Sequence, residues 1–462
     1  MLFNSFTFLL AFLPPVYAVF WWLRSRRWRY VWLTAASYVF YGFWDPRFCL
    51  LMLFSTLVSF LAGRRMARAA TPGQRKLALV VPVVIDLSLL GFFKYTNFFL
   101  ASVSQVANDV GMPMAVPYLN VVLPIGISFY TFHTISYMVD CYRRDIEPTD
   151  DFWEFSCYVS LFSQLVAGPI VRFRQIRADL EHIESSHRTA GLDVGWSFFV
   201  IGLAEKVLIA DSIAAIVNPA LAEWRSLSTA SAWLVMLGYS YQLFFDFCGY
   251  SDMAVGLGWM FGLRIPQNFN SPYKSLDMSD FWRRWHISLS SCLRDYLYIP
   301  LGGNRKGPGR TYVNLFATML LGGLWHGANW TFVVWGAYHG GLLAAQRRWG
   351  GAWARIPARA ATAVTFVLVV VGWTFFRADD LAMAVGMLGK MFSFQGGAGV
   401  AALPGLLAML AIAGVAAHVL PNTWEIKHDW GRAGTVALCA LFAASLIVMY
   451  GGQQSPFLYF QF

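Results

Sequence analysis

Long apolar segments separated by short basic loops dominate this chain, and they limit the folds open to it. A transmembrane helix needs about 20 mainly apolar residues, and shorter segments fit as tilted or partial spans. We therefore predict an all-α polytopic membrane protein with about 11–12 transmembrane helices. The segments cover residues 5–23, 30–44, 48–62, 78–101, 120–140, 193–217, 231–262, 311–325, 331–346, 360–376, 402–420 and 433–450.

The composition excludes an ordinary soluble protein. Charged residues make up 13% of the chain and hydrophobic residues 57%, whereas soluble domains carry about 25% charged residues. The net charge of +10 comes from basic residues clustered in short loops between the apolar segments. Such loops encode membrane topology, so we expect membrane lipids, and no nucleic acid, as partners.

The basic loops also predict the orientation of the chain. One face of the predicted membrane, which we assign to the cytoplasm, receives RSRRWR, RRMARAATPGQRK, CYRRD, the Arg-rich segment 264–310, QRRWGGAWARIPAR and EIKHDWGR. Both termini then lie outside the cytoplasm. The first apolar run has no basic residue before it, so we interpret it as a retained helix and not as a cleaved leader.

Two further apolar stretches, 152–170 and 278–301, are not among the predicted transmembrane segments and carry arginines at one or both ends. We interpret both as re-entrant or interfacial helices on one side of the membrane. In the second stretch, the spacing of the apolar residues predicts one helical face. That face comprises Phe281, Trp282, Trp285, Leu289, Leu293 and Tyr296.

His326 stands in the segment LLGGLWHGANW, at the end of an apolar run. An ionisable side chain at membrane depth is costly and marks a functional site by default. Gly322, Gly323 and Gly327 permit close backbone approach and a helix break around it. A neutral imidazole suits a general base or a nucleophile. The alternative is a core histidine that is hydrogen-bonded between helices.

This segment and FWRRWHISLSSCLRDYLYIPLGGN upstream, which contains His286, together resemble the signature of the membrane-bound O-acyltransferase family. The resemblance is closest to the bacterial branch that acetylates exopolysaccharides such as alginate. It extends over nearly the whole chain and implies one membrane domain of residues 1–462, with helices around a central pore. It also implies that His326 is the catalytic histidine and that His286 lies near it.

The same resemblance implies a function and its partners. The enzyme would take acetyl from cytoplasmic acetyl-CoA and pass it across the bacterial inner membrane. The recipient would be a periplasmic transferase with the serine hydrolase-like SGNH fold, which esterifies a polysaccharide. Alginate is the favoured polysaccharide, and cellulose and peptidoglycan are the alternatives.

Arg283 and Arg284 fall on the predicted cytoplasmic face, directly before His286. Arginine binds phosphate bidentately, and acetyl-CoA carries phosphates, so the two arginines are candidate donor-binding residues. The alternative is ordinary positive-inside charge on an interfacial helix that extends its arginines to lipid headgroups. His286 would then be part of that helix.

Asp246 and Asp252 are also costly at membrane depth, and we interpret them as structural hydrogen-bonding groups. The six cysteines show no CxxC spacing and mostly lie in apolar runs. They are typical of small buried hydrophobic residues, and we expect no metal.

The aromatic motif SPFLYFQF, residues 455–462, allows two interpretations. Tyrosine and phenylalanine at headgroup level form an interfacial anchor. Alternatively, the motif folds back and brings the Tyr459 phenol toward His326. The resemblance favours the second interpretation, because a similar motif in the family is implicated in relaying the acyl group outward.

Two positions depart from the family pattern. Gln164 stands where alginate-type members often carry histidine, and His133 stands where relatives tend to carry Glu or Gln.

Two rival functions stay open. One rival is a transporter or flippase of an acylated lipid or glycan, which needs a hydrophilic path and usually repeat symmetry. The other is a structural secretion subunit, in which His326 would be dispensable.

Overall fold

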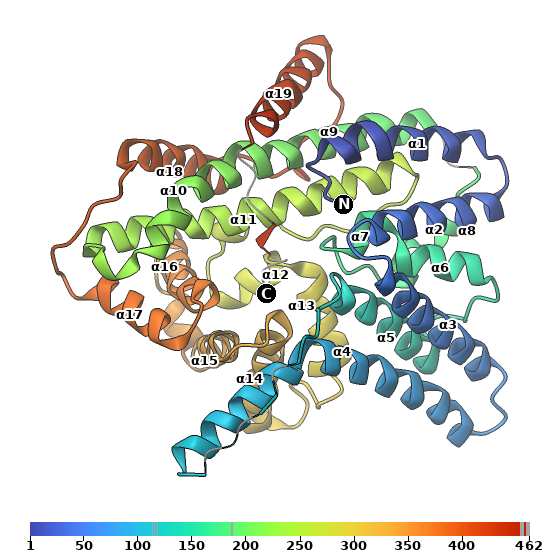
Figure 1. Ribbon diagram of the computed structural model, residues 1–462, viewed down its shortest axis with the longest axis horizontal. Coiled ribbons are helices and arrows are strands. Elements are labelled where there is room, and N and C mark those ends of the chain that lie inside the picture. Colours follow the sequence, from blue (N-terminus) through green and yellow to red (C-terminus); the bar gives the residue numbers. More distant parts are fainter. Residues whose placement is uncertain (113, 115, 118, 186–187, 453–456, 459–462) are drawn as a thin grey trace. The chain divides into compact units, whose positions relative to one another are not determined.

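The computed structural model describes residues 1–462 except 113, 115, 118, 186–187, 453–456 and 459–462, and the regular elements of the described residues are helices (Figure 1). These residues group into two compact units. Unit 1 comprises Met1–Arg188 and Met260–Ile265, and unit 2 comprises Thr189–Trp259 and Pro266–Phe462. The single domain around a central pore stays a prediction.

Unit 1 has an aromatic core between its helices. The rings of Phe8, Phe12, Phe40 and Phe162 have centroids 5.4 to 6.3 Å apart, and such ring pairs contribute beyond their buried area. Around it, α3 packs against α4 and α5, and α2 packs against α6. The elements are η1 Thr7–Phe12, α1 Leu13–Trp22, α2 Arg26–Gly42, α3 Arg47–Ala67, α4 Pro72–Asp109, α5 Ile127–Arg143, α6 Phe152–Ser160, α7 Phe162–Leu165 and α8 Phe173–Glu181.

Unit 2 holds the remaining helices. Within it, α14 packs along α15, and α15 also contacts α12 and α16. The elements are α9 Arg188–Ala204, η2 Glu205–Ala210, α10 Asp211–Ala222, η3 Trp224–Ser226, α11 Thr229–Met260, η4 Pro272–Lys274, α12 Met278–Arg284, α13 Ile287–Leu293, η5 Arg294–Tyr298, α14 Gly307–His326, α15 Trp330–Trp353, α16 Ala358–Arg377, α17 Leu381–Phe392, α18 Leu403–His418 and α19 Arg432–Tyr450.

The predicted apolar segments coincide with helices. Each of the twelve overlaps at least one helix, so the prediction of an all-α membrane protein is confirmed. Within the described residues, four helices are long and apolar enough to cross a bilayer by length and composition, namely α3, α4, α16 and α19. The full number of spans stays a prediction.

The continuous helical face predicted for the apolar stretch 278–301 is wrong, because the helix is interrupted at His286. This residue has a φ of 44°, in the left-handed region that non-glycine residues seldom adopt. The backbone is fixed there by a neighbouring segment: Asn270 N donates to Arg284 O at 2.9 Å, and Ile287 N donates to Asn268 O at 2.8 Å. His286 therefore lies between α12 and α13, and not on a helical face.

The two positions that depart from the family pattern lie in unit 1. His133 is buried, and its ring centroid is 5.5 Å from that of Tyr158. Gln164 is also buried, and its Nε2 donates to the backbone oxygen of Tyr158 at 2.7 Å. Both side chains therefore contribute to packing around Tyr158.

The predicted orientation can be tested at the C-terminal motif. A reporter enzyme that folds only outside the cytoplasm should be active when it is fused after Phe462, because the basic loops place that end outside. A fusion in the basic loop around Arg355 is the control and should give the opposite result. Cytoplasmic activity after Phe462 would mean that a short segment, such as 30–44 or 311–325, does not cross.

Candidate active site

His326 is the last residue of α14 and is almost completely buried, with 4% of its surface exposed. The rings of Trp335 and Phe376 meet its imidazole edge to face, with centroids 5.1 and 5.2 Å away. Aromatic side chains are rigid and carry large apolar surfaces. They hold the imidazole in one place and keep water from these faces of the ring.

Two glycines bring the backbones of α14 and α15 into contact just before His326. A Cβ on Gly323 would lie 2.3 Å from Phe332 O, and a Cβ on Gly336 would lie 2.5 Å from Met319 O. A larger residue at either position would force the helices apart. The main chain therefore sets the spacing of α14 and α15.

The structure brings His286 close to His326, although 40 residues separate them in the sequence. Their ring centroids are 6.5 Å apart, and His286 is completely buried. The ring of Phe247 meets the His286 imidazole edge to face at 4.7 Å. The two histidines singled out in the sequence thus lie close together in the same buried part of unit 2.

Asn268, which the sequence analysis did not identify, fixes the tautomer of His286. Its Oδ1 accepts hydrogen bonds from Ser288 N at 3.2 Å and Ser288 Oγ at 2.8 Å, and it lies 3.1 Å from His286 Nδ1. A backbone N–H can only donate, so this atom of Asn268 must be the amide oxygen. His286 Nδ1 therefore carries the proton, and Nε2 carries the lone pair.

The two candidate donor-binding arginines have different surroundings at the end of α12. Arg284 pairs with Asp280 at 3.0 Å and donates to Asn270 O at 3.3 Å. The Arg283 side chain is 70% exposed and lies 3.6 Å from the same aspartate. Arg283 is thus accessible to a ligand, whereas Arg284 also fixes the backbone before His286.

The residues before Tyr459 are docked in unit 2. Phe457 and Leu458 are buried, and Leu458 N donates to Asp246 Oδ2 at 2.9 Å. The Phe457 ring lies 4.7 Å from that of Tyr250 and 6.1 Å from that of Phe247. Because Phe247 also contacts His286, this segment reaches the edge of the histidine site. Tyr459 itself lies outside the described residues.

Lys206, a buried lysine that the sequence analysis did not identify, forms an ion pair with Asp246, the aspartate that accepts the hydrogen bond from Leu458. Lys206 Nζ lies 2.5 Å from Asp246 Oδ1 and 2.7 Å from Asp211 Oδ1. Paired charges of this kind are retained only where hydrogen bonds satisfy them, and the amide of Leu458 supplies one such bond. The structural role predicted for Asp246 thus includes an ion pair that the sequence did not reveal.

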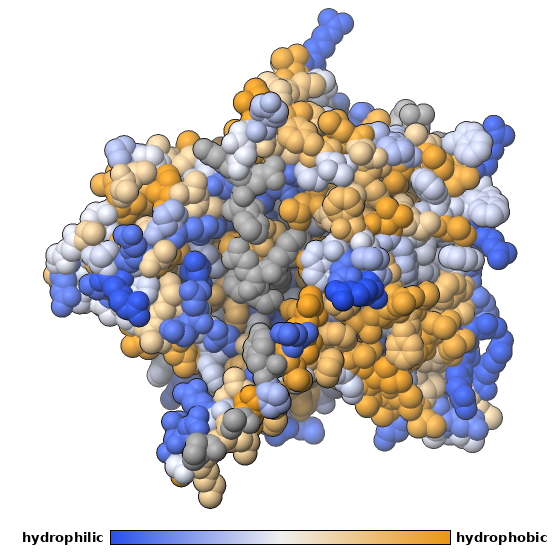
Figure 2. Space-filling view, in the orientation of Figure 1, coloured by the Kyte–Doolittle hydropathy of each residue, from blue (hydrophilic) through white to orange (hydrophobic). Residues whose placement is uncertain are grey.

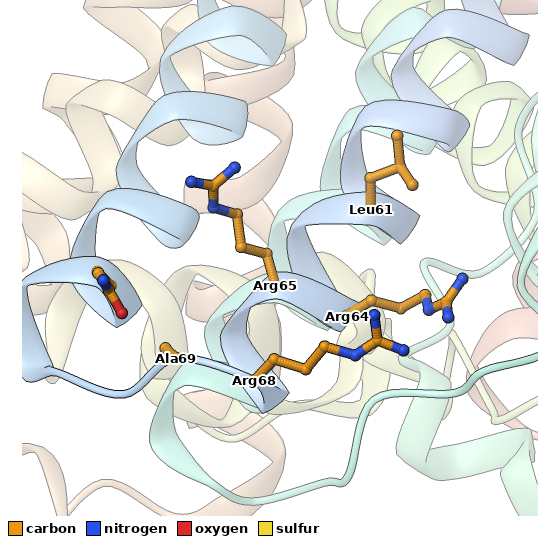
Figure 3. Close-up of a pocket in the computed structure, with 6 residues that line it drawn as sticks. Leu61, Arg64, Arg65, Arg68 and Ala69 are labelled. Carbon is orange, nitrogen blue, oxygen red and sulfur yellow. The ribbon is translucent and has the colours of Figure 1, made fainter.

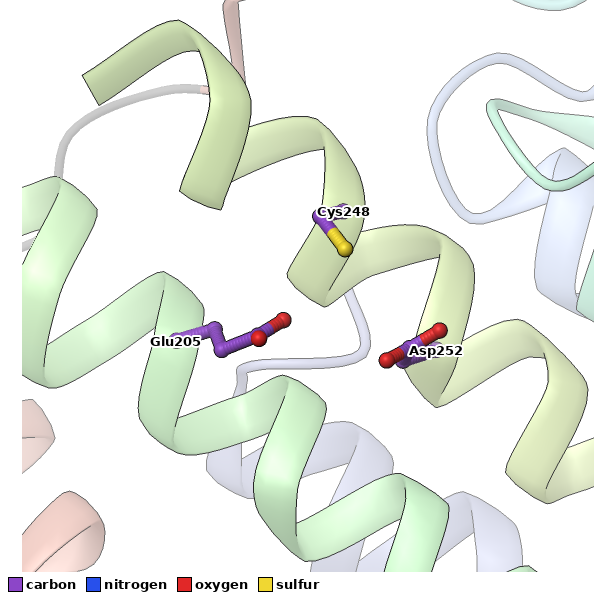
Figure 4. Close-up of side chains that lie close together, drawn as sticks. All are labelled: Glu205, Cys248 and Asp252. Atoms are coloured by element: carbon purple, nitrogen blue, oxygen red, sulfur yellow. The ribbon is translucent and has the colours of Figure 1, made fainter. Parts of the chain in front are cut away.

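A further buried histidine and a cluster of three polar side chains lie within unit 2. His339 in α15 is buried 4.7 Å from the Trp335 ring, and its ring nitrogens have no hydrogen-bond partner among the described residues. Glu205, Cys248 and Asp252 point toward one another (Figure 4), with ligand atoms within 4.8 Å. These side chains are of the types that ligate metal ions, and the absence of a metal stays a prediction.

Comparisons with known proteins agree with this geometry. Residues 145–377, which include His286 and His326, match the family model of MBOAT, the membrane-bound O-acyltransferase family. A probable alginate O-acetylase of Pseudomonas putida is 42% identical over 496 residues, covering 100% of both chains. A probable alginate O-acetylase of Pseudomonas aeruginosa is 46% identical over 399 residues, covering 85% of this chain and 75% of the relative.

A peptidoglycan O-acetyltransferase of Helicobacter pylori is 32% identical over 521 residues, covering 100% of this chain and 98% of the relative. A helical membrane protein with paired imidazoles in a buried aromatic setting has the parts of an acyl-transfer enzyme. The chain belongs to the membrane-bound O-acyltransferase family. It is thus a membrane enzyme that uses an acyl donor.

Proposed function

We propose that this chain is the membrane O-acetyltransferase of an alginate-acetylating system in the bacterial inner membrane. It takes acetyl from acetyl-CoA on the cytoplasmic side and delivers it to a periplasmic SGNH-type transferase. The observation that carries the proposal is the pairing of His286 and His326, with ring centroids 6.5 Å apart. Relatives named for alginate support the substrate, since one is 42% identical over its whole length, against 32% for the peptidoglycan enzyme.

In this proposal His326 is the general base. Its imidazole takes the proton of an acceptor hydroxyl, and the hydroxyl oxygen attacks the thioester carbonyl carbon of acetyl-CoA. The C–S bond breaks, and the imidazole returns the proton to the departing thiolate of CoA. One thioester and one hydroxyl thus give one oxygen ester and one thiol, and the histidine ends neutral.

The first acceptor is the phenol of Tyr459, which follows the docked residues Phe457 and Leu458 directly in the chain. Leu458 is held by Asp246, and Phe457 packs on Phe247, which in turn contacts His286. These contacts support a relay in which the tyrosyl acetate forms beside the histidines. The periplasmic transferase then removes the acetyl group from the tyrosine oxygen.

His286 is the second polar group of the site, and Asn268 positions it. We expect Asn268→Leu to lower acetyl transfer about tenfold or more, because His286 Nδ1 loses its acceptor and the Nε2 lone pair is no longer fixed. Transfer of labelled acetyl measures the rate, and 15N NMR of labelled histidine reports the tautomer. Ser291→Ala is the control, since it removes a hydroxyl that donates to the backbone oxygen of Ser288 at 3.0 Å. Full activity of Asn268→Leu with an unchanged tautomer would contradict this role.

Arg283 is the accessible candidate for the phosphates of acetyl-CoA. Arg283→Gln should raise the KM for acetyl-CoA about fivefold to tenfold with little change in kcat, as loss of uniform binding does. Steady-state kinetics at varied acetyl-CoA concentration measure both constants. Arg348→Gln removes an exposed arginine from α15 and should change neither. A fall in kcat at constant KM would assign Arg283 a different role.

The proposed function is tested by complementation. The chain is expressed in an alginate-producing bacterium that lacks its own membrane O-acetylase, and the ester content of the secreted polymer is measured. Restored acetylation with wild-type protein, and none with His326→Ala, is expected. No restoration of alginate esters would refute the proposed substrate. A transporter or flippase would leave labelled acetyl-CoA unconsumed by the purified protein.

Peptidoglycan acetylation is the second candidate, because the Helicobacter pylori relative aligns over 100% of this chain. The same expression experiment separates the two candidates in a strain that lacks its peptidoglycan O-acetyltransferase. Esters on muramic acid residues, without esters on alginate, would select the second candidate.

A further inference from the structure

A pocket lined by three arginines opens in unit 1, where α3 ends and α4 begins (Figure 3). The cavity has a volume of about 340 Å³, and its lining comprises Leu61, Arg64, Arg65, Arg68, Ala69 and Gln74. Arg64 Nε lies 3.2 Å from Asp150 Oδ1. Arg65 and Arg68 are exposed and form no ion pair with any residue that the structure describes. Positive charge therefore exceeds negative charge around the cavity.

The wall of this pocket contains a further hydrogen-bond donor, and hydrogen bonds fix the loop beside it. Gln74 Oε1 accepts a hydrogen bond from Ala70 N at 3.1 Å, so the Gln74 amide nitrogen stays a donor. Arg75 ties the adjoining loop to its surroundings, because it donates to Cys141 O at 2.7 Å and to Met66 O at 3.3 Å. Arginine forks and an amide group together match the oxygens of a phosphate group.

An apolar stripe leads away from the pocket along each of the two helices. Leu53, Leu57 and Leu61 are exposed on α3, at the spacing of one helical face. Leu77, Val81 and Val84 are exposed on α4 in the same way, and the two helices pack against each other. Figure 2 shows hydrophobic side chains gathered over this part of the molecule. In a bilayer, such surfaces contact acyl chains.

We propose that this pocket binds the phosphate of an anionic phospholipid, with Arg65 and Arg68 on the headgroup and the acyl chains along the two stripes. A soluble phosphate ester would use the arginines and leave the stripes bare, whereas a phospholipid uses both features. Basic pockets between transmembrane helices on the cytoplasmic side bind anionic headgroups in this way. The basic loop between α3 and α4 lies on that side in the predicted orientation.

The purified full-length protein in nanodiscs tests the proposal, with lipid retention measured by native mass spectrometry. Nanodiscs contain phosphatidylglycerol or phosphatidylcholine, and wild-type protein should retain phosphatidylglycerol preferentially. R65Q/R68Q should weaken that retention about fivefold for each arginine, on the order of 25-fold together. R347Q/R348Q is the matched control, because it removes two exposed arginines from α15, and it should retain the lipid as wild type does.

Three results would overturn the proposal. Equal loss of phosphatidylglycerol from R65Q/R68Q and from R347Q/R348Q would mean that general surface charge holds the lipid, and no loss from either would mean that Arg65 and Arg68 do not bind it. Displacement of the lipid by an equal concentration of glycerol 3-phosphate would assign the pocket to a soluble phosphate ester. Because the readout is lipid retention, it does not depend on acetyl transfer.

Discussion

Replacement of His326 by alanine is expected to lower acetyl transfer by on the order of 10²-fold or more, the loss typical of a removed general base. The protein should still fold, because Trp335 and Phe376 also contact each other, with ring centroids 5.3 Å apart. Transfer of labelled acetyl from acetyl-CoA by protein in nanodiscs measures the rate. Thermal unfolding of the same samples reports the fold.

The matched control for this prediction is His182→Ala, which removes an exposed imidazole just after α8 in unit 1. It should retain wild-type activity. If His326→Ala also retained near-native activity, the catalytic assignment would be wrong and a structural secretion subunit would be favoured.

Tyr459→Phe is expected to stop delivery of acetyl to the polysaccharide while the segment stays docked. A free phenol with a pKa near 10 is a poor nucleophile at pH 7 without a base, so the relay requires both the hydroxyl and His326. The substitution keeps the apolar area, and buried Phe457 and Leu458 each contribute about 1.5–3 kcal/mol to docking. Polymer ester content should fall on the order of 10²-fold.

Tyr450→Phe is the control for the relay, because it removes one hydroxyl from an exposed tyrosine at the end of α19. It should leave polymer acetylation unchanged. Normal acetylation in the Tyr459→Phe strain would reduce the motif to an interfacial anchor. If acetylation is lost, protease accessibility of the motif distinguishes loss of docking from loss of the hydroxyl.

The long helices were predictable because apolar length alone identifies them. The segment 78–101, for example, lies within α4, Pro72–Asp109. By contrast, α17 was missed because its 12 residues fall well short of the about 20 that a span needs. The break at His286 was also missed, since it depends on hydrogen bonds to Asn268 and Asn270, and no local period encodes such a contact.

The residues of the candidate site likewise divide into those that the sequence indicated and those that only the structure revealed. His326 was singled out because an ionisable group at the end of an apolar run is costly enough to be conspicuous, whereas His286 stands among basic and aromatic residues and was singled out by the family resemblance. Their proximity came from the family resemblance and not from the spacing. Lys206 is equally costly, but its partners Asp211 and Asp246 lie on two different helices, and only the folded chain reveals that pairing. Asn268 stands in an irregular segment, where the sequence has no periodic signal.

The contact between Gly323 and Gly336 has a mechanical consequence. Membrane proteins meet bilayers of different thickness, and their helices respond by tilting. At Gly323 and Gly336 the main chains of the two helices touch with no compressible side chain between them, so we expect α14 and α15 to tilt together. The imidazole at the end of α14 and the indole of Trp335 on α15 should then move together, and we expect the geometry around His326 to persist when the lipid composition of the cell changes.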